Sequence, residues 1–343
     1  MMKKIIGITM GDPAGIGPEI SIKAFQKKSL YEKCKPLLIG DKSIIEAYLA
    51  KFPQFNLKVN AITTPEDGVY EWGTIDVIDM NCVDATQLQI GEVSKEGGNA
   101  AYQYVEKVIE LALEGKVAAT VTNPLNKEAL NLAGHHFAGH TEIYGHLTKT
   151  NKFSMMLADG DLRVVHVSTH VSLRQACDLA KKERVLDVIN IANQACINLG
   201  IENPRIAVAG LNPHCGENGL FGTEEIEEII PAIEAAKKEG MNVFGPIPAD
   251  TVFSKARGGM YDIVVTMYHD QGHIPLKLLG FVYDKNLNKW KEVSGVNITL
   301  GLPIIRTSVD HGTAFDQAGS MAASELSLEN AIDYAVQLAK NKN

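Results

Sequence analysis

Residues 5–19 read IIGITMGDPAGIGPE, a short apolar run followed by a glycine-rich turn and a helix start. The run Ile5–Met10 has the length and apolar character of a buried strand. The three glycines after it permit a tight turn, and Pro18 and Glu19 suit the first turn of a helix. The opening of the chain therefore predicts a strand–turn–helix unit of an α/β fold.

The glycine-rich turn matches no standard nucleotide-binding motif. It departs from GxGxxG because Pro18 and Glu19 directly follow Gly17, and no Gly-Lys-Ser/Thr follows as in a phosphate loop. Two interpretations of this turn remain open: a purely structural turn, and a loop that lies beside a nucleotide or phosphate.

The same alternation continues along the chain. Helical patterns such as Ala100–Glu114 and Thr223–Glu239 lie between short apolar runs. Further buried strands are predicted at Pro36–Gly40, Ile75–Asp79, Val117–Thr122, Ser154–Ala158, Arg163–Ser168, Arg205–Gly210 and Asp262–Met267. This alternation predicts mostly parallel sheets with helices on both faces. A chain of 343 residues favours two domains or one large α/β unit, and no linker marks a boundary.

Composition narrows the class of protein. The chain has 33 Lys+Arg against 41 Asp+Glu, a net charge of −8, which argues against a nucleic-acid partner. No apolar stretch is long enough for a membrane span or a secretory signal. The five cysteines are odd in number and form no CxxC, so we expect reduced thiols and a cytoplasmic protein.

Three of the predicted strands run into histidines: His170, His214 and His269. In open α/β sheets, ligands bind at the carboxyl ends of the strands, so three imidazoles at that edge would suit one divalent cation. The alternative is that each is an ordinary surface or capping histidine. The spacing is not that of a compact metal motif, and both interpretations stay open on the pattern alone.

Other polar residues suit an anionic ligand. His140 and Thr141 begin a predicted helix whose N-terminus would hold a phosphate or carboxylate, and Lys127 follows an earlier strand. Lys277 and Arg306, with Asn297 between them, add two cations and an amide. For each of these residues an ordinary cap or surface charge is the alternative.

A glycine-flanked loop near the end of the chain adds one more candidate. Residues 308–319, SVDHGTAFDQAG, contain small residues that let a flat ring approach the backbone.

Several long segments together resemble the 4-hydroxythreonine-4-phosphate dehydrogenase (PdxA) family of the vitamin B6 pathway. The resemblance spans Gly7 to about Gly319, and HGTAFDQAG also looks like the adenine-side loop of isocitrate and isopropylmalate dehydrogenases. The segments are GITMGDPAGIGPEI, NPLNKEALNLAG, GHTE, LNPHCGENGLFGTEEIEEIIPAI, PADTVF, MYHDQGHIPLKLLGF and VNITLGLPIIRTSVDHGTAFDQAG.

The resemblance implies a set of functional residues. A divalent metal (Zn, Mg, Mn or Co) would bind His170, His214 and His269, with one ligand from the partner subunit of a homodimer. Substrate would contact His140, Thr141, Lys277, Asn297 and Arg306, with Asp250 and Lys127 as weaker candidates. NAD, with NADP left open, would lie at His311, Gly312, Asp316 and Gly319. No general base is assigned.

The implied reaction is the NAD-dependent oxidation of 4-(phosphooxy)-L-threonine at C3. The product, 2-amino-3-oxo-4-(phosphooxy)butanoate, is a β-keto acid that decarboxylates to 3-amino-2-oxopropyl phosphate. As a Lewis acid, the metal would stabilise the C3 alkoxide. The main alternative is a dehydrogenase of D-erythronate or D-threonate 4-phosphate in sugar-acid catabolism. A non-catalytic protein that binds a phosphorylated ligand is the minor alternative.

The resemblance also implies the architecture, a two-lobed fold like that of isocitrate and isopropylmalate dehydrogenases, with a cleft between the lobes. Residues 1–125 and 280–343 would form the NAD lobe, and residues 126–279 the lobe for metal, substrate and dimerisation. Residues 282–295 look longer than in many relatives, and we expect an exposed hairpin or loop there.

Overall fold

The computed structural model describes residues 3–285 and 289–341 and divides them into two compact units. The first unit contains the described residues up to Asn151, Lys291–Val296 and Leu302–Lys340. The second contains the described part of Lys152–Trp290, together with Asn297–Gly301 and Asn341. The N-terminal and C-terminal parts of the chain thus share one unit. The functional lobes expected from the sequence, divided after residues 125 and 279, stay a prediction.

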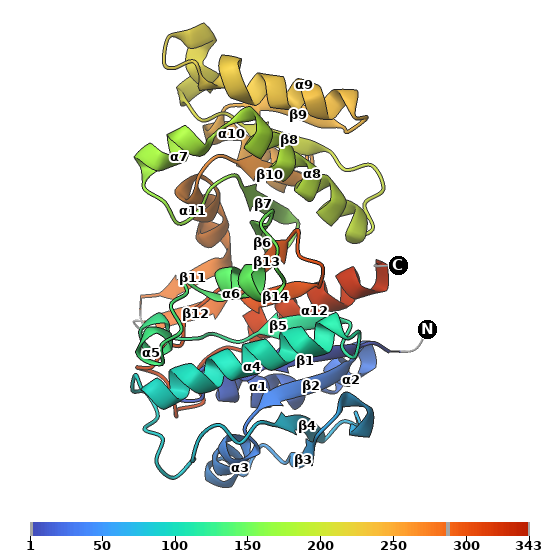
Figure 1. The fold of residues 1–343 in the computed structure, drawn as a ribbon, viewed down its shortest axis with the longest axis vertical. Helices are drawn as coiled ribbons and strands as arrows, with labels where there is room; N and C mark the ends of the chain where they lie inside the picture. The colour runs from blue at the N-terminus through green and yellow to red at the C-terminus, as the bar shows by residue number, and fades with distance from the viewer. Residues whose placement is uncertain (1–2, 286–288, 342–343) are drawn as a thin grey trace. The chain divides into compact units, whose positions relative to one another are not determined.

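The first unit is a parallel sheet with helices packed on it (Figure 1). Its strand order is β3-β4-β2-β1-β5-β14. The strands are β1 (Ile5–Thr9), β2 (Lys35–Gly40), β3 (Lys58–Ile62), β4 (Thr74–Asp79), β5 (Ala119–Thr122) and β14 (Arg306–Val309). The helices are α1 (Gly17–Phe25), α2 (Lys28–Lys33), α3 (Lys42–Lys51), α4 (Lys95–Leu113), α5 (Lys127–Leu132), α6 (His140–Leu147) and α12 (Leu326–Asn341), and a 3₁₀ turn spans Pro65–Asp67.

The second unit is also α/β, with strand order β13-β6-β7-β10-β8-β9. The pairs β7–β10, β10–β8 and β8–β9 are parallel, whereas β6–β7 is antiparallel. The strands are β6 (Ser154–Asp159), β7 (Leu162–His166), β8 (Ile206–Ala209), β9 (Val243–Ile247), β10 (Ile263–Thr266) and β13 (Val296–Leu300). The helices are α7 (Leu173–Leu179), α8 (Lys182–Asn198), α9 (Ile230–Lys238), α10 (Ala249–Arg257) and α11 (His269–Gly280). Two irregular turns, η2 (Pro213–Gly219) and η3 (Glu225–Ile229), lie between β8 and α9.

Burial explains why these segments form strands. β10 is buried at all four positions and β1 at four of five, as expected for strands covered on both faces. All eight strands predicted from the sequence are present, so the predicted α/β class with mostly parallel sheets is confirmed. Two strands of the hairpin expected at residues 282–295 are present, since β11 (Phe281–Asp284) and β12 (Lys289–Val293) form a separate two-stranded sheet, and residues 286–288 between them lie outside the described residues.

None of the helices within residues 3–285 and 289–341 has the length and apolar character that crossing a membrane requires.

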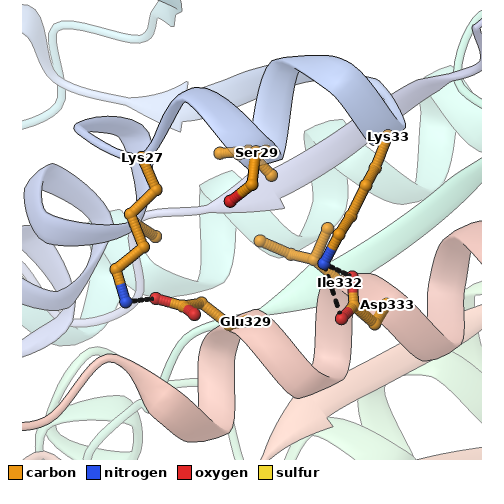
Figure 2. Close-up of a pocket in the computed structure, with 8 residues that line it drawn as sticks. Lys27, Ser29, Lys33, Glu329, Ile332 and Asp333 are labelled. Atoms are coloured by element: carbon orange, nitrogen blue, oxygen red, sulfur yellow. Dashed lines mark hydrogen bonds and ion pairs between the residues drawn. The ribbon is translucent and has the colours of Figure 1, made fainter.

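The C-terminal helix α12 packs against α2 in the first unit. Figure 2 shows Lys27 paired with Glu329 and Lys33 paired with Asp333 between the two helices. Such partly exposed ion pairs each contribute about 0–1 kcal/mol. The apolar side of α12 is also buried, with Leu328 fully so, and burial of such a side chain stabilises by about 1.5–3 kcal/mol.

Two predicted helices begin differently from what the sequence indicated. Helix α4 starts at Lys95 rather than Ala100, and the Ser94 hydroxyl accepts a hydrogen bond from the Gly97 amide at its N-terminus. Gly97 and Gly98 obscured this start because glycine weakens helix propensity. The helix predicted from Thr223 begins instead with the wide π-turn η3, where the Ile230 amide bonds the Glu225 carbonyl. Its N-cap position is Glu224, which makes no side-chain cap.

Buried carboxylates hold the loops that follow the strands of the first unit. Asp12, 1% exposed, accepts a hydrogen bond from the Ala14 amide at 3.0 Å, just after β1. Asp41, fully buried after β2, accepts one from the Val83 amide at 2.6 Å. Burial raises the pKa of Asp12 to about 6, because desolvation outweighs the hydrogen bond from the Ala14 amide.

Gly98 gives a first test of this packing. A Cβ added there would lie 2.1 Å from the Ala129 carbonyl oxygen of α5, so Gly98→Ala forces two helices apart. We expect it to destabilise the chain by about 2 kcal/mol or more, although alanine normally favours a helix over glycine by about 1 kcal/mol. Urea unfolding measures the change, with the exposed Glu110→Ala on the same helix as control. An increase in stability would show that α4 and α5 do not pack this closely.

The raised pKa of Asp12 gives a second test. The folded chain holds the Asp12 proton up to about pH 6, whereas the ordinary carboxyl loses it near 3.8. The folded state therefore binds more protons between these values, so the carboxyl makes the free energy of unfolding fall as pH rises through this window. Asp12→Asn has no ionisable group at this position, so its free energy of unfolding does not fall in this way as pH rises. Its stability relative to the wild type should grow by roughly 3 kcal/mol from pH 4 to pH 7.

The matched control for Asp12→Asn is Asp84→Asn. The Thr86 hydroxyl and then the Thr86 amide hold the pKa of exposed Asp84 below its usual value. A lowered pKa gives stability that is present at higher pH and lost as pH falls, so this variant should show the opposite trend. Urea titrations at several pH values that stay parallel for Asp12→Asn and the wild type would contradict the assignment.

Candidate functional site

The strand order of the first unit places a topological switch point at the carboxyl ends of β1 and β5. From β1 the chain runs to β2, β3 and β4 on one side, and then returns to β5 on the other side of β1. Such a switch point is where open α/β sheets bind ligands. The loop after β1 meets the loop after β5 there, since the Asp12 amide donates to the Pro124 carbonyl at 2.9 Å.

The predicted cofactor loop, residues 308–319, packs against the glycine-rich turn. The Ile16 amide donates to the Thr313 carbonyl at 3.0 Å. A Cβ on Gly15 would lie 3.0 Å from that same carbonyl oxygen, so only glycine fits easily. The structure therefore brings together two motifs that the sequence could single out only separately.

The buried carboxylate of Glu19 fixes the far end of the same loop. It accepts a hydrogen bond from the amide of Gly319, 300 residues later in the chain. Burial raises the pKa of Glu19, and the amide hydrogen bond from Gly319 partly offsets this. Lys51 Nζ also donates to the Gly319 carbonyl at 2.9 Å. The loop is thus anchored through its backbone.

Within this loop, His311 is a candidate binding group. Its Nδ1 lies 3.0 Å from the Gly312 carbonyl, which makes Nδ1 the donor and leaves Nε2 as an acceptor. Nε2 is buried and has no hydrogen-bond partner among residues 3–285 and 289–341. Burial lowers the pKa of His311, so the ring is neutral at pH 7. Asp316, by contrast, is exposed.

Arg306, His140 and Thr141 form a second cluster in the first unit. Arg306 is 2% exposed, donates from Nη2 to the Thr122 hydroxyl at 2.8 Å, and lies with Cζ 5.5 Å from the centre of the Tyr144 ring. Burial lowers the pKa of Arg306 to about 10, so the guanidinium stays charged at neutral pH. Burial and then the nearby Arg306 charge hold the pKa of His140 well below its usual range.

The surroundings of this cluster suit an anion. Thr141 is 8% exposed and sits in the first turn of α6. His140 Nε2 is buried without a hydrogen-bond partner in the described part of the chain. The Lys127 side chain lies near Gly139, since a Cβ there would be 3.9 Å from Lys127 Cε. A buried guanidinium beside a neutral imidazole and a helix N-terminus is an arrangement that binds phosphate or carboxylate.

In the second unit, two of the three predicted metal histidines lie close together. His170 follows β7 and His269 follows the adjacent parallel strand β10, and their ring centres are 6.0 Å apart. Both line a groove of about 570 Å³ with Tyr268 and Asp270. The Asp270 carboxylate lies 2.7 Å from His269 Nδ1. A carboxylate on one ring nitrogen orients an imidazole and leaves Nε2 for a metal.

His214 does not join them within one chain. Across residues 3–285 and 289–341, no three His, Cys, Asp or Glu side chains are placed to hold one metal ion. His214 is exposed in η2, where five successive residues, 214–218, have left-handed backbone angles. Four of these residues are not glycine, and for Cys215 and Glu217 this conformation costs about 1–2 kcal/mol each. Such strain is concentrated at functional sites.

The remaining predicted residues also lie in the second unit. Lys277 is exposed on α11, with Nζ 4.8 Å from the centre of the Phe281 ring. Asn297 is half-buried in β13, and its Oδ1 has no hydrogen-bond partner among the described residues. Asp250 is exposed in the first turn of α10. The site roles of all these residues stay predictions.

Sequence reasoning missed the hydrogen bonds that the carboxylates of Asp12 and Glu19 accept from the amides of Ala14 and Gly319. Glu19 carried no signal for this role, since a glutamate in the first turn of a helix is explained by the helix dipole alone. Asp270 could be noted as the residue that directly follows His269, but its 2.7 Å contact with His269 Nδ1 could not be foreseen.

Comparison with known proteins identifies the family. The family model described as "Pyridoxal phosphate biosynthetic protein PdxA" matches residues 32–335. The "Putative D-threonate 4-phosphate dehydrogenase" of Oceanobacillus iheyensis is 52% identical over 342 residues, 99% of each chain. A protein of the same name from Symbiobacterium thermophilum is 48% identical over 98% of this chain and 97% of its own.

A solved structure agrees with these matches. The 4-hydroxythreonine-4-phosphate dehydrogenase of Klebsiella pneumoniae has a TM-score of 0.87 at 47% identity, covering 98% of both chains. The resemblance inferred from the sequence is confirmed over nearly the whole chain. This protein therefore belongs to the PdxA family and is a dehydrogenase of that family.

Proposed function

We propose that this chain is an NAD-dependent and divalent-metal-dependent dehydrogenase of D-threonate 4-phosphate, with D-erythronate 4-phosphate as the closely related alternative substrate. The observation that supports this substrate is the name shared by the relatives at 52% and 48% identity. The sequence alone favoured 4-(phosphooxy)-L-threonine and a role in vitamin B6 synthesis. That substrate is now the second candidate, favoured by the name of the Klebsiella pneumoniae structure.

Both candidate substrates carry a phosphate, a carboxylate and a C3 hydroxyl. The buried Arg306 guanidinium would bind one anionic group, and a neutral His140 would donate or accept one hydrogen bond there. Lys277 and Asn297 are proposed as further substrate contacts, and Asp250 and Lys127 as weaker ones. Oxidation at C3 gives a β-keto acid, whose decarboxylation from the sugar acid leaves dihydroxyacetone phosphate.

The residues present fit a divalent metal. The Asp270 carboxylate on His269 Nδ1 leaves Nε2 for an ion, and His170 lies within reach of the same ion. When bound, a metal supplies Lewis-acid stabilisation of an alkoxide or enolate. His170 and His269 would hold it from one chain, and His214 from the partner of a homodimer.

Exposed apolar residues beside His214 support the homodimer. Leu220 is 72% exposed, and Phe221 and Ile226 are about half exposed, all within 12 residues of His214. A cluster of this kind is typical of a surface that another chain covers. We further propose that the protein acts in the cytoplasm, as the free cysteines suggest.

The residues of the predicted loop fit a dinucleotide. His311 presents a buried acceptor nitrogen with no hydrogen-bond partner among the described residues, which suits an amino group such as that of adenine. Gly312 adds open space, because a Cβ there would meet nothing within 4 Å. When bound, NAD accepts the hydride from C3. The proposed cofactor-binding residues of this loop also include Asp316 and Gly319.

The substrate assignment predicts the outcome of a direct assay. The purified protein with a divalent ion should reduce NAD faster with D-threonate or D-erythronate 4-phosphate than with 4-(phosphooxy)-L-threonine, as followed by absorbance. Chelation should abolish the reaction and added ion restore it. Faster reduction with the amino acid would assign the chain to B6 synthesis, and no reduction with any of them would favour the binding-protein alternative.

Arg306 gives a second prediction for this function. Arg306→Lys removes the planar pair of donors, so we expect KM for the phosphorylated substrate to rise about tenfold to a hundredfold. The control is Arg184→Lys, at a half-buried arginine that donates hydrogen bonds to the Val167 and Phe153 carbonyls. That variant should lower the unfolding temperature with little effect on KM. An unchanged KM for a folded Arg306→Lys enzyme would remove Arg306 from the site.

A further inference from the structure

The turn that carries His214 has a backbone of the wrong hand for L-amino acids. From His214 (φ 53°, ψ 28°) to Asn218 (φ 55°, ψ 34°) every residue is left-handed, and only Gly216 adopts such angles freely. A turn of this kind does not persist by its own preference. Contacts elsewhere must hold it.

The side chain of Glu225 supplies these contacts. It is 1% exposed, and one carboxylate oxygen accepts hydrogen bonds from the amides of Leu211 and Asn212, both at 2.7 Å. The other oxygen accepts from the Asn212 side-chain amide at 2.9 Å. These donors lie in the three residues that precede His214, so the carboxylate fixes where the left-handed turn begins.

Glycines let the chain wrap closely around this carboxylate. A Cβ on Gly210 would lie 3.2 Å from Glu225 Oε1, and one on Gly216 would lie 2.9 Å from Oε2. The carboxylate therefore lies on the concave side of the loop, with Gly210 close to one of its oxygens and Gly216 close to the other. It fills the position that a bound anion takes in a nest of backbone amides.

The π-turn η3 accounts for the placement of Glu225. Pro231 has no N–H to donate to the carbonyl four residues earlier, and its ring crowds that carbonyl. The helix widens before it, with the Ile230 amide bonding the Glu225 carbonyl. One extra residue in a helical turn rotates the preceding side chains by about 100° relative to α9. π-Turns of this kind recur at functional sites.

We propose that Glu225 is a positioning residue that holds the left-handed turn in place and so presents the His214 imidazole to the metal. This inference rests on the proposed function, because it requires His214 to be a metal ligand. Glu225 does not touch the metal or the substrate in this account. Its effect is exerted through the backbone of residues 211–214.

The test is a Co²⁺ titration of the full-length protein, with a chromophoric chelator as competitor and the cobalt absorption spectrum as second readout. Glu225→Ala should weaken Co²⁺ binding about tenfold to a hundredfold and alter the spectrum, since the ligand loses its support. Glu225→Gln keeps an acceptor for the two amides but loses the charge, so its affinity should fall between Ala and wild type. Glu227→Gln, at an exposed position of the same π-turn, should match the wild type.

Two further measurements separate the possible failures. Circular dichroism and sedimentation must show that the variants fold and associate like the wild type. If Glu225→Ala does not fold, Glu225→Gln carries the test, and its affinity must be at least about threefold weaker. Wild-type affinity and spectrum in the folded variants would overturn the inference.

His214→Ala tests the proposed metal site itself. If it binds Co²⁺ as tightly as the wild type, the proposed role of His214 fails, and the inference fails with it. If His214→Ala loses the ion while Glu225→Ala retains it, only the positioning role of Glu225 is wrong.

Discussion

Buried carboxylates that accept hydrogen bonds from backbone amides are the interaction on which this structure depends. Asp12, Asp41 and Glu19 hold loops in the first unit, and Glu225 does the same in the second. None of these contacts is an ion pair. In each, N–H groups that a loop would otherwise leave unsatisfied offset part of the cost of removing the carboxylate from water.

This mode of support explains why the candidate groups that do lie on loops, such as His311, have defined positions, whereas Arg306 and His140 lie in a strand and a helix. A loop at a strand end has few apolar side chains to bury, so packing alone fixes it weakly. A carboxylate such as that of Glu19, which reaches the loop from helix α1, fixes the backbone itself and leaves the loop side chains available. The cost is desolvation, which is visible in the raised pKa values of Asp12, Asp41 and Glu19.

The sequence was sufficient for most of the strands, because a run such as Ile5–Met10 is apolar throughout and bounded by glycine. It was insufficient for β3, whose residues KVNAI are mostly half-buried or exposed, and for β9, whose VFGPI contains glycine and proline. The residue types at the candidate site could also be named from motifs. The contacts between them could not, because Arg306 meets Thr122 and Glu19 meets Gly319 across some 180 and 300 residues. The left-handed turn at His214 carries only a weak local signal, since Gly216 and Asn218 tolerate that conformation but Cys215 and Glu217 usually avoid it.

The handedness of that turn limits how the segment can change. Proline is excluded at all five positions by its fixed negative φ, and β-branched residues are strongly disfavoured. At the positions other than His214, glycine, asparagine and aspartate are therefore the replacements that the backbone accepts most readily. A mirror-image amino acid placed at Cys215 or Glu217 by chemical synthesis would adopt these angles without strain. At these two positions an L-residue is strained by the backbone angles that the fold requires, and a D-residue would make the turn more rigid.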